Sequence, residues 1–99
     1  MEKDIFNTKE ARALFRAILS LKNAKECESF FRDICTIKEV EEMSARFRIA
    51  QMLSAAKPKP YAEIAKEVRT STATVTRVAH WLHHGAGGYR LALKRTSNS

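Results

Sequence analysis

Residues 60–85 constrain the fold more than any other stretch, because they predict two short helices joined by a tight turn. Ser71 or Thr70 can cap the second helix by accepting a hydrogen bond from one of its free backbone N–H groups. On each side of the turn apolar residues recur at helical spacing, so the two stripes can pack against each other. The stripes are Tyr61, Ile64, Ala65 and Val68 before the turn and Val75, Val78, Ala79 and Leu82 after it. The stretch therefore predicts a helix-turn-helix over about residues 60–85.

Small side chains at the turn and at the start of the second helix favour a role in reading DNA. They are Thr70, Ser71, Thr72, Ala73 and Thr76. A recognition helix must approach the floor of the major groove, where Ser, Thr and Ala contact base edges or thymine methyl groups without steric conflict. Arg69 occupies a turn position that usually takes glycine, since the backbone there tends towards positive φ, at a cost of about 1 kcal/mol. An ordinary helical hairpin with solvated threonines is the simpler alternative.

The positive charge is concentrated in the half of the chain that holds this motif. The net charge is +7, and residues 57–99 carry eight Lys or Arg against two Asp or Glu, whereas residues 1–56 carry ten and nine. Such asymmetry suits a surface that faces phosphates. The sequence has no signal peptide and no apolar run long enough to span a bilayer. We therefore expect a cytoplasmic protein with no membrane partner.

The rest of the chain predicts further helices and a single domain over residues 1–99. Three spacings typical of capping boxes, Asn7 with Glu10, Asn23 with Glu26 and Thr36 with Glu39, open helices that we expect over about residues 8–22, 23–34 and 36–56. A last short helix is expected from Tyr89 to about Arg95. The fold class is thus all-α with about six helices. The stripes of the first three helices expose more apolar surface than a monomer of this size can cover, so we expect a homodimer.

Other chemistry has weaker support in the sequence. His80, His83 and His84 are spaced so that they could share a metal ion, but no Cys or carboxylate accompanies them nearby, and we expect no metal site. A metal-responsive regulator is the third-ranked hypothesis. Cys27 falls on an apolar stripe and is interpreted as a small core residue. Because no nucleophile has an evident triad partner and no Gly-rich loop follows a strand, we expect no enzyme activity.

Four segments resemble the Trp repressor superfamily, and more closely its branch of YerC/YecD-type Trp repressor-like proteins. The segments are residues 14–21, 33–36, 45–50 and 73–77, read as LFRAILSL, DICT, ARFRIA and ATVTR. The resemblance implies an all-α fold of about six helices, an intertwined homodimer built from the N-terminal helices, and operator binding by two helix-turn-helix units.

The resemblance also implies an effector pocket, from which this chain departs at two positions. The tryptophan ligand of the family's namesake lies between two arginines that correspond to Arg46 and Arg77, with a threonine corresponding to Thr36 nearby. Val78 stands where the namesake has glycine against the indole, and Trp81 stands where it has serine. We therefore do not expect tryptophan to act as a strong corepressor, and an unidentified small-molecule effector stays open.

The DNA-contacting positions depart from the namesake as well. Ala62 and Ala65 stand where its first motif helix has basic residues that reach DNA, and Lys59, Lys66 and Arg69 are the candidate replacements. The sequence as a whole predicts a sequence-specific transcriptional repressor that binds a double-stranded DNA operator as a homodimer. The alternative from another class is a dimeric helical protein-interaction module without DNA binding.

Overall fold

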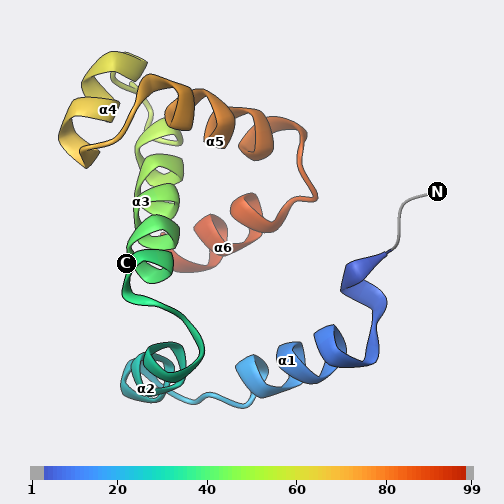
Figure 1. The fold of residues 1–99 in the computed structure, drawn as a ribbon. Coiled ribbons are helices and arrows are strands. Elements are labelled where there is room, and N and C mark those ends of the chain that lie inside the picture. The colour runs from blue at the N-terminus through green and yellow to red at the C-terminus, as the bar shows by residue number, and fades with distance from the viewer. Residues whose placement is uncertain (1–3, 98–99) are drawn as a thin grey trace. The chain divides into compact units, whose positions relative to one another are not determined.

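The computed structural model describes residues 4–97, and all regular structure in that range is helical. The prediction of an all-α fold with six α-helices is confirmed (Figure 1). The elements are a short 3₁₀ helix η1 (Ile5–Asn7), α1 (Lys9–Leu19), α2 (Ala24–Ile34), α3 (Ile37–Leu53), α4 (Tyr61–Val68), α5 (Thr72–His84) and α6 (Gly88–Thr96). None of the described helices is long and apolar enough to cross a membrane.

The described residues form two compact units. The first ends at Ile37 and the second begins at Lys38, so we name them the N-terminal unit (residues 4–37) and the C-terminal unit (residues 38–97). The expected single domain over residues 1–99 remains a proposal, because it depends on what covers the apolar side chains of the N-terminal unit.

Helix α1 begins one residue later than the capping box predicted and ends earlier. Thr8, rather than Asn7, is the N-cap, and its Oγ1 accepts a hydrogen bond from the N–H of Ala11 at 3.0 Å. Asn7 instead ends the 3₁₀ helix, which the sequence did not indicate. The helix stops at Leu19, where the Ser20 hydroxyl donates back to a helix carbonyl at 2.6 Å. The predicted extension to residue 22 is wrong. The hydroxyl and the N–H of Ser20 both donate to carbonyls of the last turn, and the helix ends there.

Helix α2 begins as the sequence predicts. The Asn23 side chain accepts a hydrogen bond from the N–H of Glu26 at 2.9 Å, which satisfies one of the free donors of the first turn. The carboxylate of Glu26 reaches back to the N–H of Lys22 at 2.9 Å, one residue before the position that a standard capping box would use.

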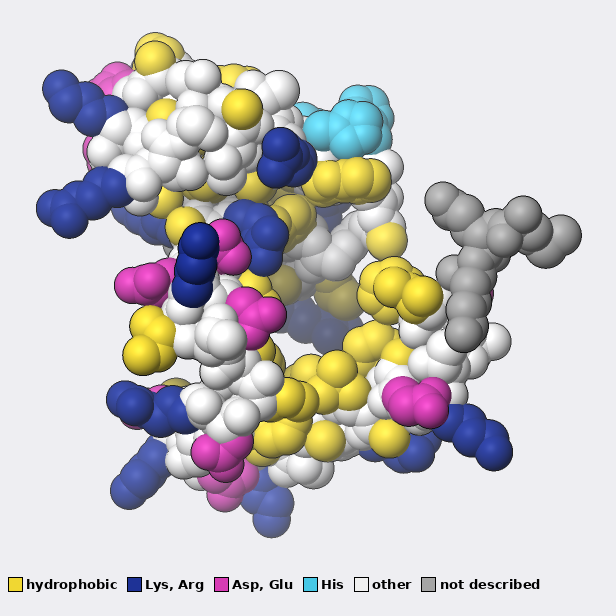
Figure 2. Space-filling model, in the orientation of Figure 1, with side chains coloured by type: hydrophobic (Ala, Val, Ile, Leu, Met, Phe, Trp, Pro, Cys, Tyr) yellow, Lys and Arg dark blue, Asp and Glu magenta, His cyan; other side chains and the backbone are white. Residues whose placement is uncertain are grey.

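No residue of the N-terminal unit is buried in the single chain. Its apolar side chains are partly covered at most, and Leu19 and Ile37 are 83% and 81% exposed. Figure 2 shows hydrophobic side chains gathered along α1. Cys27, expected to point into the core, is exposed. The stripes on α1 and α2 are therefore present as predicted but have too little of the chain to pack against.

The C-terminal unit, in contrast, has a core that α3, α4 and α5 build together. The buried cluster comprises Ile49, Ala50, Ile64, Ala65, Val75 and Val78. The predicted stripe of the second motif helix is confirmed in full, and Ala79 and Leu82 complete it. Tyr61 of the first stripe is instead 42% exposed. Helix α3 ends at Leu53, three residues short of the prediction. The pair of motif helices lies at one end of α3 (Figure 1).

The connection from α5 to α6 depends on a close backbone approach at Gly85. Its N–H donates to the carbonyl of Trp81 at 2.9 Å, and a Cβ atom at this position would lie 2.3 Å from that oxygen. Arg90 on α6 then donates from Nε to the carbonyl of Leu82 at 3.0 Å, which caps the end of α5. Tyr89 and Leu93 of α6 pack on the core cluster. The end of the second motif helix is therefore held by both the turn and α6.

Candidate nucleic-acid interface and pocket

The turn between α4 and α5 is short because one residue adopts the left-handed conformation. Arg69 has φ 64° and ψ 51°, and among the described residues it is the one non-glycine with positive φ. The N–H of Thr70 then donates to the carbonyl of Ala65 at 2.9 Å, which closes the turn. The expectation that Arg69 takes the place of a turn glycine is confirmed.

Two of the small residues predicted to contact DNA have structural roles at this turn. Ser71 is the N-cap of α5, and its Oγ accepts a hydrogen bond from the N–H of Thr74 at 3.1 Å. The same Oγ lies 3.0 Å from the hydroxyl of Thr74. Thr70 is half-buried and lines a pocket. Ser71 therefore fixes where α5 begins, which determines where the following residues project.

The first two turns of α5 present small polar side chains to solvent. Thr72, Ala73 and Thr76 are all exposed. No acidic residue stands in the first turn of α5, so the partial positive charge at this helix end is not offset locally. An exposed, small-residue helix start of this kind can approach a polyanion closely. Thr72, Ala73 and Thr76 were predicted to contact DNA, and that role stays a prediction.

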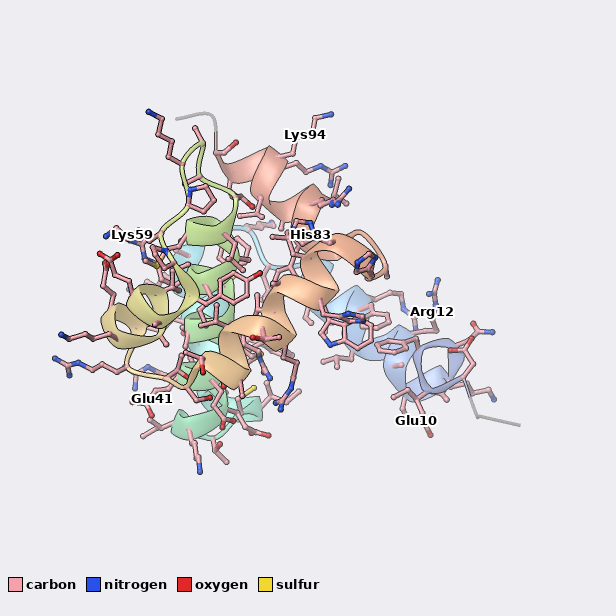
Figure 3. All side chains as sticks on the ribbon, turned by 90° about the horizontal axis from the view of Figure 1, so that it is seen from above. Glu10, Arg12, Glu41, Lys59, His83 and Lys94 are labelled. Carbon is pink, nitrogen blue, oxygen red and sulfur yellow. The ribbon has the colours of Figure 1, made fainter. Side chains whose placement is uncertain are left out.

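The three predicted phosphate-contacting cations differ in their surroundings. Lys66 is exposed on α4, and no ion pair is found for it among residues 4–97. Arg69 is exposed at the turn and also lines the pocket. Lys59 forms an ion pair with Glu67 of α4 and lies beside the start of that helix (Figure 3). The hydrogen bond with Glu67, and then its charge, raise the pKa of Lys59.

A pocket of about 560 Å³ lies within the C-terminal unit, between α3, the turn, α5 and α6. It brings together four of the five predicted effector residues, Arg46, Arg77, Val78 and Trp81. Thr36, the fifth, belongs to the N-terminal unit and is not part of this lining. Arg46 and Arg77, the two arginines that the family resemblance assigns to an effector pocket, therefore line the same cavity.

Sequence reasoning missed the charged wall that α3 contributes to the pocket. Lys38, Glu41 and Glu42 line it together with Arg46. Lys38, Glu42 and Arg46 are each four residues apart, which places them on one side of a helix. That spacing could have indicated from the sequence that these three charged residues share one side of α3. The pocket therefore carries both signs of charge, with Tyr89 and Trp81 as aromatic lining.

The two residues that depart from the family pattern are positioned differently in the pocket. Val78 is 2% exposed and belongs to the core cluster, so its isopropyl group is fixed between the core and the cavity. Trp81 is 55% exposed, and its ring lies edge-on to His80 with centroids 4.9 Å apart.

The histidines on α5 contact one another without forming a ligand set. The centroids of His80 and His84 are 5.3 Å apart, and those of His83 and His84 are 6.4 Å apart. Within residues 4–97, no group of three or more His, Cys, Asp or Glu side chains could hold a metal ion.

These features define the class of the protein. It is a small all-α protein. Its basic half contains α4, a turn with a left-handed residue, and α5, whose first turns carry small exposed side chains.

The chain belongs to the Trp repressor protein family, whose model matches residues 9–97. It is 39% identical over 99 residues to the uncharacterised protein YerC of Bacillus subtilis (strain 168), a match that covers 100% of this chain and 93% of YerC. A TrpR-like protein from Eubacterium eligens ATCC 27750 has a similar structure, with a TM-score of 0.89, 38% identity and 97% of each chain covered. A candidate Trp repressor from Staphylococcus aureus gives a TM-score of 0.87 at 35% identity, with 100% of this chain and 97% of that chain covered.

Proposed function

We propose that the chain is a sequence-specific transcriptional repressor that binds double-stranded DNA through α4, the turn and α5. The observation that carries the proposal is the exposed start of α5, where Thr72, Ala73 and Thr76 project beyond the Ser71 cap. Helix N-termini and small polar side chains are the groups that such proteins direct at base edges and phosphates. Lys66 and Arg69 flank this surface as phosphate contacts. Membership in the Trp repressor family supports the same assignment.

The proposed active form is a homodimer. The N-terminal unit buries none of its described residues, and a second copy of the chain would cover its apolar stripes. A dimer would also present two copies of α5, as operators with two half-sites require.

A small-molecule effector is a second proposal, favoured by the pocket of about 560 Å³ beside α5. Its volume falls within the range typical of ligand sites. Arginine guanidinium groups and glutamate carboxylates on its walls would suit a ligand that carries both charges, and Trp81 and Tyr89 would suit an apolar or aromatic part. Because Arg77 and Val78 belong to α5, a bound ligand would act directly on the proposed recognition helix.

Selection of DNA fragments tests the proposed repressor function. The purified protein is mixed with sheared genomic DNA, and the retained fragments are sequenced and assayed by gel shift. We expect a shared motif with two related half-sites. Retention of fragments without any common sequence would remove sequence specificity, whereas failure to retain any DNA would favour the protein-interaction module.

A further inference from the structure

The acidic residues of the basic half of the chain lie together beside one lysine. Residues 57–99 contain two carboxylates, Glu63 and Glu67, and both belong to α4. Glu67 forms an ion pair and a hydrogen bond with Lys59, and Glu63 acts on the same ammonium group through its charge. Lys59 precedes Pro60, the N-cap of α4. Glu63 and Glu67 are one helical turn apart on α4, so the negative charge of this half lies along one side of the first motif helix, next to Lys59.

Lys59 is engaged by this pair but remains accessible. Its side chain is 49% exposed and that of Glu67 is 41% exposed. Arg48 of α3 lies near enough to disfavour the charge on Lys59, so Glu67 also offsets that repulsion. Exposed ion pairs are weak and are screened by salt. A competing anion of higher charge density can therefore take the ammonium group from the carboxylate.

We propose that Glu67 is an internal competitor of DNA phosphate for Lys59 and thereby limits the affinity of the protein for DNA. The inference rests on the proposed function. The first helix of a helix-turn-helix crosses the DNA backbone, which would bring a phosphate towards its N-terminal end. That phosphate must either displace Glu67 from Lys59 or lie beside an additional negative charge. In both cases Lys59 contributes less to binding than a free lysine would.

A set of charge-neutralising variants separates this competition from a general effect of charge. Glu67→Gln releases Lys59, whereas Glu63→Gln removes the same charge from the same helix and leaves the ion pair in place. Lys59→Gln and the double variant Lys59→Gln/Glu67→Gln complete the comparison. Glu67→Ala is a second way of releasing the lysine. Affinity for a selected DNA fragment is measured over a range of salt concentrations, and thermal unfolding of each variant confirms that it is folded.

We expect Glu67→Gln and Glu67→Ala to bind DNA roughly 2- to 5-fold more tightly than the parent, the range that corresponds to one exposed ion pair. The slope of log affinity against log salt should steepen by about 0.9 per protomer, because one more cation displaces counterions from DNA. Glu63→Gln should leave the slope unchanged. In the Lys59→Gln background the gain from Glu67→Gln should vanish.

Two results would overturn the inference while leaving the proposed function intact. One is an equal effect of Glu63→Gln and Glu67→Gln, and the other is a gain from Glu67→Gln that persists without Lys59. Either would mean that Glu67 acts only through long-range charge. If no folded variant, the parent included, binds DNA with a salt-dependent affinity, the proposed function fails and this inference fails with it.

Discussion

Single residues fix the two ends of the proposed recognition helix. At its start the Ser71 hydroxyl caps α5, and Arg69 accepts a left-handed backbone so that the turn can be short. At its end Gly85 allows the chain to pass within hydrogen-bonding distance of the Trp81 carbonyl. Since Gly85 leaves no space for a Cβ atom, its contribution can be measured directly.

Gly85→Ala should destabilise the protein by about 1–3 kcal/mol, because the new methyl group would lie 2.3 Å from the Trp81 carbonyl oxygen and the backbone must move. Gly88→Ala is the matched control, since nothing lies within 4 Å of its Cβ position, and it should leave stability unchanged or raise it by about 0.4–1 kcal/mol. Urea unfolding of both variants checks this. Equal free energies of unfolding for the two would contradict the close approach at Gly85.

Free tryptophan should bind weakly and should not enhance DNA binding. An indole that packs on glycine in the family's namesake meets the isopropyl group of Val78 here, and that group is fixed in the core. Overpacking by this amount costs about 1–3 kcal/mol, which weakens binding roughly 5- to 150-fold. Calorimetric titration measures the affinity, and gel shifts with and without tryptophan measure the response. Micromolar affinity with enhanced DNA binding would refute the steric argument, whereas a response gained in Val78→Gly would support it.

Turn conformation and helix capping could be predicted from the sequence at some residues, whereas the lining of the pocket could be predicted only in part. The left-handed Arg69 followed from turn rules, and capping rules left Ser71 or Thr70 as the cap of α5, of which the structure has Ser71. The cap of α1 was placed at Asn7 instead of Thr8, because both residues can cap and nothing local decides between them. The pocket glutamates were missed, because their surroundings depend on how α3 packs against α5 and α6, which periodicity does not specify.

At the scale of elements, α5 combines a buried stripe with an exposed polar face. Val75, Val78, Ala79 and Leu82 are buried, and their spacing was visible in the sequence. Helix types and the order of all six α-helices were therefore predictable, while the ends of α1 and α3 were not. Both helices stop earlier than predicted, and backbone N–H groups at Ser20 and Ser54 fold back onto carbonyls of the last turn.

The exposed face of α5 should determine which DNA sequence the protein selects. Thr72→Ala/Thr76→Ala should change the motif recovered by fragment selection, because direct base contacts carry sequence information. Lys66→Gln is the control, and it should weaken binding to all sequences and reduce the salt slope by about 1 per protomer. If the double threonine variant still binds DNA and recovers the parent motif, α5 is not the recognition helix.

At the scale of the whole molecule, the two units differ in how well one chain can cover them. The C-terminal unit has a buried core of residues from three helices, whereas the N-terminal unit has none. The sequence showed the stripes on α1 and α2 but could not show what covers them, because a stripe is identical whether its partner lies in the same chain or in another.

The protein should be a dimer at micromolar concentration in light scattering. Leu19→Gln removes an apolar side chain that is 83% exposed in the single chain, and it should shift the equilibrium towards monomer. Lys22→Gln, three residues further on and also exposed, should leave the dimer unchanged. A parent protein that scatters as a monomer at high concentration would remove the basis for the proposed dimer.

The salt dependence of DNA binding tests the central claim most directly. A gel shift with a selected DNA fragment is run at 50 mM and 200 mM salt, beside a fragment of unrelated sequence. We expect the selected fragment to bind more tightly than the unrelated one, and we expect its affinity to fall steeply with salt, by roughly a factor of 10³ or more for six or more phosphate contacts. Absence of binding at both salt concentrations, or an affinity that neither salt nor sequence changes, would contradict the central claim.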